Sequence, residues 1–257
     1  MRYLVISDIH GNLEALEAVL AAAGAHDRVL VLGDLVGYGA DPNAVIERVR
    51  ALPSSTVIRG NHDKVAAGIE TVEGFNRLAR QAIEWTAATL TAENRAWLAG
   101  LPAGPLDVDD QIEICHGTPF DEDVYVFDEL DALRSIDAAS RPFCLFGHTH
   151  VPAIFRVGRS GAAEDPGDRS GRELDTTAPV RGFPFRLDLD DRSRYLLNCG
   201  AVGQPRDLDA RAASGLFDSE ARCLTFVRTT YDITAAQDKI VQAGLPEVLA
   251  QRLAVGR

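Results

Sequence analysis

The chain has 257 residues, of which 46% are hydrophobic and 25% are charged. This is an ordinary globular composition, and the length suffices for one domain with a sizeable buried core. The formal net charge of −12 argues against nucleic acid as a partner, because duplex binding requires a basic surface. A small anionic substrate remains compatible with this charge where a metal ion supplies local positive charge.

Strands and helices alternate at the start of the chain. Short apolar runs predict strands at residues 3–6, 28–32 and 56–59. Apolar residues at helical spacing follow the first strand, and a second helix is expected to begin with Asp41 as N-cap and Pro42 in the first turn. This alternation predicts parallel βαβ units and therefore an α/β fold.

The remainder of the chain predicts helices at residues 75–101, 130–136, 234–243 and 246–253, a hairpin at 106–114 and a strand at 143–146. Further strands are predicted at residues 183–189, 195–198, 215–217 and 223–228. We expect these last strands to pair antiparallel in a second sheet. Residues 158–181 are polar and rich in glycine, and we interpret them as a mobile insertion in a single domain over residues 1–257.

The cysteines stand far apart in the sequence and form no C-x-x-C pair. They are Cys115, Cys144, Cys199 and Cys223. This spacing predicts buried, reduced thiols rather than a zinc ribbon or a disulfide scaffold. No apolar run approaches the ~18 residues of a membrane span, and the first residues lack the pattern of a signal peptide. We therefore expect no membrane segment and a location in the reducing cytoplasm.

Histidines are concentrated in the turns that follow predicted strands. Of the six in the chain, five lie in such turns, namely His10, His62, His116, His148 and His150. Asp8, Asp34 and Asn61 accompany them. A single histidine in a turn is usually solvated, but this concentration predicts a metal site. Imidazoles and carboxylates without thiolates suit manganese, iron or zinc.

Asp34 is the predicted centre of that site. It follows a buried strand at the sheet edge where open α/β folds place their ligands. There are more candidate donors than one metal ion needs. A two-metal site requires a carboxylate that bridges ions about 3.5–4 Å apart. We predict that Asp34 is this bridge. Glycines at positions 33, 60, 117 and 147 are expected to let the turns converge without Cβ clashes.

Together these motifs resemble a known series. The motifs are Asp8-x-His10, Gly33-Asp34, Gly60-Asn61-His62-Asp63, His116 and Gly147-His148-x-His150. In this order they resemble the calcineurin-like metallophosphoesterase superfamily. The segments GDLVGYGADPN and LLNCGAVGQPRD resemble its small bacterial and archaeal phosphodiesterase-like members, often grouped with diadenosine tetraphosphate hydrolases. The resemblance covers roughly residues 1–155 and 194–230. It implies a four-layer α/β/β/α sandwich of two mixed sheets flanked by helices.

The resemblance also implies a ligand set for two divalent metal ions, with manganese favoured over iron, zinc, nickel or cobalt. One ion would be held by Asp8, His10, Asp34 and His150. The other would be held by Asp34, Asn61, His116 and His148. A hydroxide that bridges the ions would attack phosphorus in line. His62 would protonate the leaving oxygen or stabilise the transition state. Asp63 would orient His62, or would instead be a helix N-cap.

Substrate contacts are expected from side chains outside the metal motifs. Arg206 is the first candidate, as a bidentate ligand of a phosphoryl oxygen, although it could instead pair with Asp207. Asn12 and Arg59 could also face the phosphate, and Tyr38 could line the site or be an exposed loop residue. Family members commonly read Asn-Pro-Gly-Ser at residues 198–201, where this chain reads Asn-Cys-Gly-Ala. The difference removes a hydroxyl and a rigid proline from this turn.

The resulting functional prediction is a metal-dependent phosphoric ester hydrolase whose partner is a small phosphorylated substrate of phosphodiester or nucleotide type. The same metal set would also serve a phosphomonoesterase, a protein phosphatase or a dinucleoside tetraphosphate hydrolase. A non-catalytic scaffold is disfavoured because no expected ligand is missing, and a nuclease is disfavoured by the acidic composition. The sequence does not decide between a monomer and a homo-oligomer.

Overall fold

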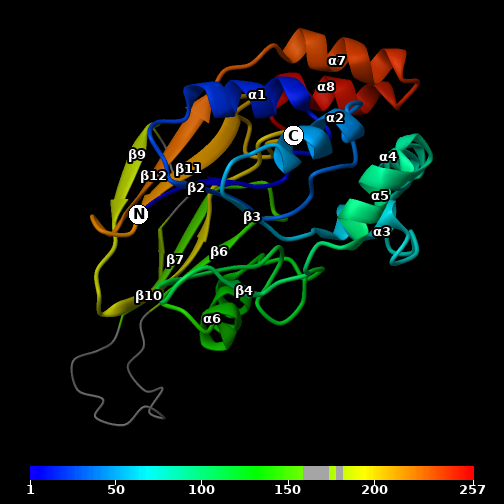
Figure 1. The fold of residues 1–257 in the computed structure, drawn as a ribbon. Coiled ribbons are helices and arrows are strands. Elements are labelled where there is room, and N and C mark those ends of the chain that lie inside the picture. The colour runs from blue at the N-terminus through cyan, green and yellow to red at the C-terminus, as the bar shows by residue number, and fades with distance from the viewer. Residues whose placement is uncertain (159–173, 178–181) are drawn as a thin grey trace.

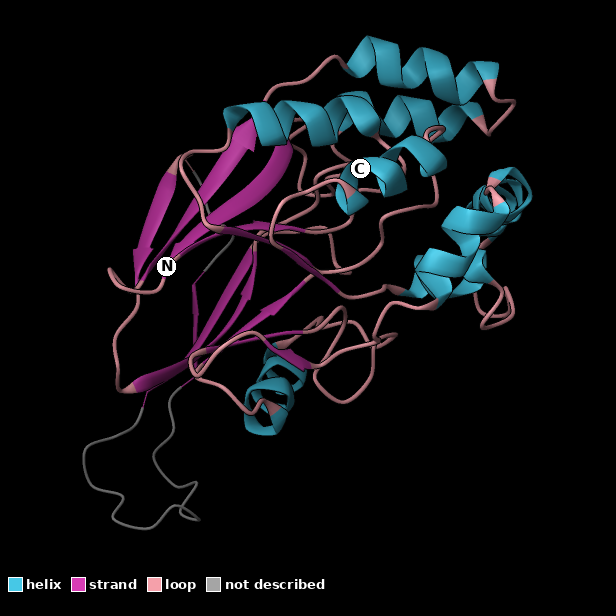
Figure 2. Ribbon diagram, viewed as in Figure 1, coloured by secondary structure: helices cyan, strands magenta, loops and turns pink. Residues whose placement is uncertain are grey.

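The computed structural model describes residues 1–158, 174–177 and 182–257. Within them two mixed six-stranded sheets pack face to face (Figures 1 and 2). The first has the order β3-β2-β1-β11-β12-β9, with β1 Arg2–Ile6, β2 Arg28–Val31, β3 Ser55–Val57, β9 Phe185–Asp188, β11 Ala212–Asp218 and β12 Cys223–Thr229. The second has the order β4-β5-β6-β10-β7-β8, with β4 Leu106–Asp107, β5 Ile112–Ile114, β6 Phe143–Phe146, β7 Ala153–Gly158, β8 Leu174–Thr177 and β10 Ser193–Asn198.

Helices flank the two sheets on their outer sides. They are α1 Leu13–Ala22, α2 Pro42–Arg50, α3 Asn61–Ala67, α4 Arg77–Thr89, α5 Ala92–Ala99, α6 Glu129–Ala138, α7 Ile233–Gln242 and α8 Glu247–Val255. Figure 1 shows α1, α7 and α8 on the side of the first sheet and α6 on the side of the second. This arrangement confirms the predicted α/β/β/α layers. None of the described helices is long and apolar enough to cross a membrane.

The core explains why the first strands are continuous apolar runs. In β1, Leu4 and Ile6 pack into the cluster shared with α1 and α2, whereas Tyr3 and Val5 pack into the cluster between the two sheets. Successive side chains of a strand point to opposite faces, so a strand buried on both faces needs apolar residues at every position. As predicted, β1, β2 and β3 pair parallel, and all four cysteines are free and buried.

The expected composition of the second sheet is wrong. Strands β9, β11 and β12 complete the first sheet, because β11 pairs antiparallel with β1 in the register Leu4↔Leu216. Only β10 joins the second sheet, parallel to β6 and antiparallel to β7. The strand β7 was not predicted, and β8 lies inside the range expected to be a mobile insertion. The other residues of that range, 159–173 and 178–181, lie outside the described residues. That the chain forms a single domain over residues 1–257 stays a prediction.

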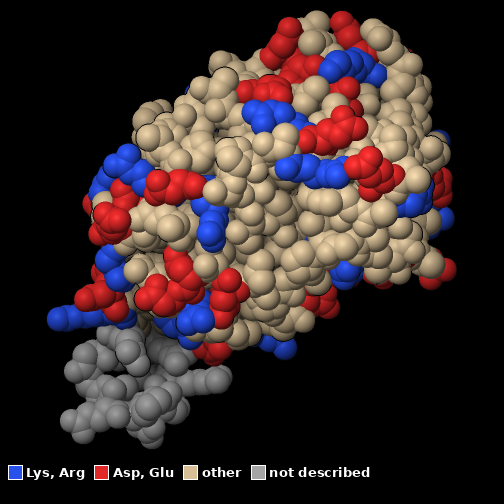
Figure 3. All heavy atoms as spheres, in the orientation of Figure 1, with Lys and Arg blue, Asp and Glu red and all other residues tan. Residues whose placement is uncertain are grey.

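The surface drawn in Figure 3 carries Lys and Arg interspersed with Asp and Glu around a broad uncharged area. Several charges near α1 and α2 belong to pairs between helices. Lys239 Nζ of α7 lies 2.8 Å from Asp41 Oδ2 and also pairs with Glu14 of α1. Asp41 precedes α2 as predicted, but its side chain makes no capping hydrogen bond, because it faces Lys239 instead.

Candidate metal centre

The turns after β1 and β2 are tied together by backbone hydrogen bonds. The amide of Asp8 donates to the carbonyl of Gly33 at 3.1 Å, and that of His10 donates to the carbonyl of Asp34 at 2.9 Å. Many residues of the candidate site have the left-handed conformation that L-residues rarely adopt. These are Asp8 (φ 54°), His10 (φ 50°), Asp34 (φ 52°), His148 (φ 65°) and His150 (φ 60°). Such conformations cost roughly 1–3 kcal/mol each and concentrate at functional sites.

The predicted donors gather in two buried clusters. One contains Asp8, His10, Asp34 and His150, and the other contains Asp34, His116 and His148. Within each cluster the candidate ligand atoms lie within 4.8 Å of one another. Asp34 belongs to both, and its side chain is only 1% exposed. The side-chain oxygen of Asn61 joins the second cluster, 3.2 Å from His116 Nε2.

Each of the four clustered imidazoles has one ring nitrogen against a backbone carbonyl. The pairs are His10 Nδ1 with Val36 O (3.0 Å), His116 Nδ1 with Leu32 O (2.8 Å), His148 Nε2 with Asp123 O (3.1 Å) and His150 Nδ1 with Gln204 O (2.7 Å). A carbonyl only accepts, so each of these nitrogens carries the proton and donates it. The second ring nitrogen is thereby left to present its lone pair to the centre, as in metal-ligating histidines.

Those second nitrogens face one another in pairs. His10 Nε2 lies 3.1 Å from His150 Nε2, and His116 Nε2 lies 3.2 Å from His148 Nδ1. Two neutral imidazoles in this orientation repel unless a cation or a proton lies between them. The separations match two nitrogens that each lie about 2.1 Å from one shared ion. The arrangement, the carboxylates and the missing thiolates fit divalent metal ions.

Burial and close opposite charges shift the pKa values of the clustered side chains. Burial lowers the pKa of His116, but the charges of Asp34 and Asp8 outweigh it and raise that pKa to about 10. Burial also acts on Asp34, whose pKa is nevertheless held well below its usual value by the neighbouring His116 and His62. Burial raises the pKa of Asp8 to about 7. The centre is thus a buried group of mixed charge in which His116 and Asp34 compensate each other.

Two glycines let carboxylates approach the backbone closely. A Cβ at Gly60 would lie 2.1 Å from Asp34 Oδ1, and a Cβ at Gly147 would lie 2.0 Å from Ser7 Oγ and 2.9 Å from Asp8 Oδ2. Real Cβ atoms do not approach so closely, so only glycine fits both positions. This bears out the expectation that glycines allow the turns to converge.

His62, Tyr38 and Arg206 lie beside the first cluster. The ring of His62 is 4.8 Å from that of His10 and 4.6 Å from that of Tyr38. Burial and the charges of Arg206 and His116 lower the pKa of His62 to about 4, against the opposing effect of Asp34. Tyr38 is 6% exposed, so the alternative of an exposed loop tyrosine is wrong.

Arg206 faces this group rather than the neighbouring acid. Its guanidinium carbon lies 5.7 Å from the centre of the Tyr38 ring, and it donates to Gln204 Oε1 at 3.1 Å. Asp207 pairs instead with the buried Arg228. The alternative pairing of Arg206 with Asp207 is therefore not formed.

Three other side chains predicted for the site, those of Asp63, Asn12 and Arg59, have hydrogen-bond partners within the fold. Both oxygens of Asp63 accept backbone N–H groups, from Val36 at 3.1 Å and from Gly60 at 2.9 Å. His62 Nδ1 has no hydrogen-bond partner among the described residues, so the expectation that Asp63 orients His62 is corrected. The alternative of an N-cap is wrong in position, because Gly60 is the N-cap of α3. Asp63 is the N3 residue, and its carboxylate accepts the N–H of Gly60 in a capping box.

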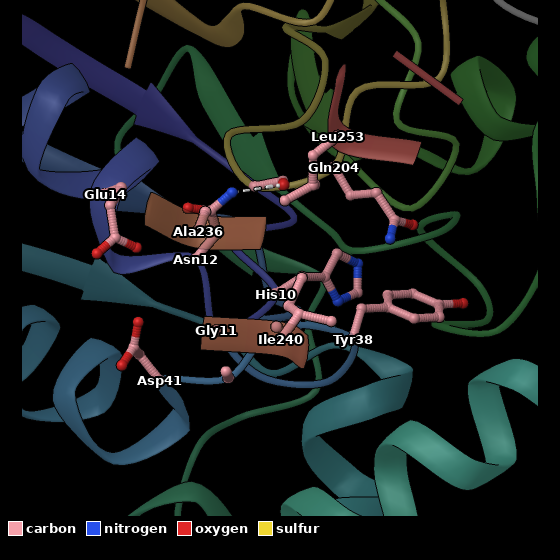
Figure 4. Close-up of a pocket in the computed structure, with 13 residues that line it drawn as sticks. His10, Gly11, Asn12, Glu14, Tyr38, Asp41, Gln204, Ala236, Ile240 and Leu253 are labelled. Atoms are coloured by element: carbon pink, nitrogen blue, oxygen red, sulfur yellow. Dashed lines mark hydrogen bonds between the residues drawn. The ribbon is translucent and has the colours of Figure 1, made fainter. Parts of the chain in front are cut away.

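Asn12 and Arg59 are likewise engaged in hydrogen bonds within the fold. Asn12 Oδ1 caps α1 by accepting from the amide of Ala15 at 3.1 Å, and its Nδ2 donates to the carbonyl of Gly203 at 2.9 Å, drawn as the dashed line in Figure 4. Arg59 makes two hydrogen bonds to Glu122, at 3.0 and 3.2 Å. The polar ends of both residues already have partners.

Two hollows adjoin the centre. The one drawn in Figure 4 is lined by His10 and Tyr38 among others and has a volume of about 10 Å³, which is room for about one water molecule. A cleft of about 290 Å³ is lined by His62, His148 and Tyr125 among others. Sequence reasoning missed Tyr125, because no motif or spacing marks it. Its ring centre lies 3.7 Å from that of His148.

Comparison with known proteins agrees with the geometry. The model of the calcineurin-like phosphoesterase superfamily domain matches residues 1–220. An uncharacterized protein of Methanocaldococcus jannaschii is 35% identical over 98% of this chain and 97% of its own length. The crystal structure of a metallophosphoesterase from Sphaerobacter thermophilus is 39% identical, with a TM-score of 0.83 over 100% of this chain and 99% of that one.

A more distant structure, a hypothetical protein from Pyrococcus horikoshii, is 20% identical, with a TM-score of 0.75 over 100% of this chain and 98% of that one. At this identity the likeness concerns the fold. The family match covers most of the chain and includes every clustered donor. The chain therefore belongs to the calcineurin-like phosphoesterase superfamily.

Proposed function

We propose that this phosphoesterase hydrolyses phosphodiester or nucleotide-type substrates with two divalent metal ions, manganese first among them. The observation that carries the proposal is the arrangement of the four imidazoles, each fixed by a backbone carbonyl and facing another across 3.1–3.2 Å. Asp34 stands between the two pairs and belongs to both clusters. No other arrangement of the described residues offers two adjacent donor sets with a common carboxylate.

In this proposal Asp8, His10, Asp34 and His150 hold one ion. Asp34, Asn61, His116 and His148 hold the other. When bound, the ions polarise a phosphoryl oxygen and lower the pKa of water. The backbone carbonyls keep the imidazoles in the tautomers that ligation requires. His62 lines the cleft beside the clusters, and this position supports the proposed role in which it donates a hydrogen bond to the leaving oxygen.

Metal binding is expected to stabilise the protein measurably. Addition of Mn²⁺ to chelator-treated protein at about 100 times its Kd should add about 2.7 kcal/mol, and the Tm should rise by roughly 5–10 °C for a domain of this size. The stabilisation arises because a cation between the facing nitrogens replaces their repulsion. Differential scanning calorimetry measures the shift, and hydrolysis of bis-p-nitrophenyl phosphate should appear at the same metal concentrations. An unchanged Tm and no hydrolysis with manganese, iron, zinc, nickel or cobalt would contradict the proposal.

Arg206 is expected to contribute to substrate binding. Its guanidinium donates to Gln204 Oε1 at 3.1 Å and also interacts with the Tyr38 side chain, beside the first donor cluster, where we expect it to bind a phosphoryl oxygen. Arg206→Ala should lower kcat/KM for bis-p-nitrophenyl phosphate about 30-fold, since a charge-assisted hydrogen bond contributes ~1.5–3 kcal/mol. Arg206→Lys should recover only part of the loss. Arg186→Ala is the control, because Arg186 pairs with Asp188 on the exposed edge of β9. Equal kinetics for the Arg206→Ala and wild-type proteins would contradict the role.

A substrate panel separates the remaining alternatives. The same donor sets would serve a phosphomonoesterase, a protein phosphatase or a dinucleoside tetraphosphate hydrolase, so we compare phosphomonoesters, phosphopeptides, cyclic nucleotides and dinucleoside polyphosphates at fixed metal. Faster hydrolysis of monoesters than diesters would replace the diesterase proposal. The four buried free thiols are in keeping with the proposed cytoplasmic location.

A further inference from the structure

The cleft beside the donor clusters has the size of a small-molecule site. Its volume is about 290 Å³, near the lower end of the usual range for ligand pockets. Because His62 and His148 line it, the cleft begins directly at the candidate metal centre. A group attached to a phosphorus atom at that centre would enter this space.

Aromatic side chains from three separate loops line the cleft. Tyr38 follows β2, Phe75 precedes α4, and Tyr125 lies between β5 and α6. The ring of Phe75 packs edge-on against His62 at 4.8 Å. Flat aromatic surfaces favour a planar ring as the occupant, through stacked or edge-to-face contacts.

The loop that carries Tyr125 is held in place by its own contacts. The carbonyl of Asp123 accepts from His148 Nε2 at 3.1 Å, and Glu122 pairs with both Arg59 and Lys64. The cleft is therefore preorganised, and a ligand that enters it loses little free energy to the ordering of the loop.

The charges that line the cleft disfavour an anionic occupant. They come from Lys64, Glu70, Glu73 and Asp123, one cation against three acids. Lys64 pairs with both Glu70 and Asp123. Glu73 has no ion pair within the described part of the chain. A like charge placed beside it would be repelled, whereas an uncharged ring would not.

We propose that this cleft receives the leaving group of the substrate and selects an uncharged planar ring, the chemistry of a nucleoside base, over an anionic group. The inference rests on the proposed phosphoesterase function and adds the specificity of its leaving-group side. In the reaction the phosphorus–oxygen bond to this group breaks, a water oxygen bonds to phosphorus, and the leaving oxygen takes up a proton.

The test uses two methyl aryl phosphates whose leaving phenols carry either a nitro group or a carboxylate. Both are assayed with manganese-loaded wild-type protein and with Glu73→Gln. The ratio of kcat/KM for the two esters in each protein is compared, so that their different intrinsic reactivities cancel. We expect Glu73→Gln to shift this ratio about fivefold towards the carboxylate ester, since loss of a nearby like charge is worth ~1 kcal/mol. Glu84→Gln, an exposed acid of α4 away from the cleft, should leave the ratio unchanged.

A second variant tests the aromatic wall. Tyr125→Leu should raise KM for the nitrophenyl ester about fivefold with a smaller effect on kcat, in line with the loss of one ring–ring contact. No hydrolysis of either ester by the wild-type protein would overturn the proposed function and this inference with it. Hydrolysis with the same ester ratio in Glu73→Gln and wild type, together with an unchanged KM in Tyr125→Leu, would overturn the inference alone.

Discussion

Asp34→Asn is expected to lower kcat/KM for bis-p-nitrophenyl phosphate by about 10³-fold, equivalent to ~4 kcal/mol of transition-state stabilisation. Asp34 is the one described residue common to both donor clusters, so loss of its charge weakens both proposed metal sites at once. It also removes the negative charge that lies 3.4 Å from His116 Nε2. Steady-state kinetics at saturating Mn²⁺ measure the loss, and elemental analysis should show fewer than two metal ions per chain.

The substitution separates the loss of metal from the loss of fold. An asparagine has the shape of Asp34 and can still accept the backbone N–H of His62, which lies 2.9 Å from Asp34 Oδ1. The circular dichroism spectrum should therefore be unchanged. Asp191→Asn, an exposed turn residue, is the matched control and should retain full activity. An Asp34→Asn protein with two bound ions and wild-type kinetics would refute the bridging role.

The donors of the candidate centre were predictable because each lies where a strand ends. A local apolar run identifies a strand, and the next few residues then occupy the same edge of the sheet. Asp34 after β2 and His148 after β6 illustrate this. Their residue types, imidazoles and carboxylates without thiolates, also limit which metal ions they can bind. Position and type together sufficed to predict which side chains meet, although no single turn would have done so.

Hydrogen bonds that form only in the folded chain were not predictable. Asp63 accepts from Val36, 27 positions away in the sequence, and Arg59 binds Glu122. The side chains of both residues are of a type that could contact a substrate or act in catalysis, but in the folded chain they form hydrogen bonds to other protein groups. The same reason explains the error in the second sheet. Whether β11 pairs with β1 or with β10 depends on how the two sheets stack, and the local pattern of each strand is alike in both cases.

Gly203→Ala is expected to lower the free energy of unfolding by about 3 kcal/mol. A Cβ at this position would lie 1.8 Å from the carbonyl oxygen of Ile9 and 2.6 Å from its carbon. These are backbone atoms, so no side-chain rotation relieves the clash. Gly203 also donates its N–H to the carbonyl of Asp8 at 2.9 Å. The alanine must therefore push away the turn that carries Asp8 and His10. Urea unfolding followed by tryptophan fluorescence measures the change.

Displacement of the turn that carries Asp8 and His10 should lower the catalytic rate as well as the stability. A misplacement of about 1 Å typically costs about 100-fold in rate, so Gly203→Ala should lose activity at temperatures where it remains folded. Gly24→Ala is the matched control, because its Cβ would meet only Leu216 Cδ2 at an ordinary 3.8 Å. Equal stability of the two alanine variants would show that the turn after β1 is not held against Gly203. Reduced stability with full activity would show that the donors tolerate movement of this turn. Asp34 and His150 come from other strands, and in that case these two residues would suffice to position the first metal ion.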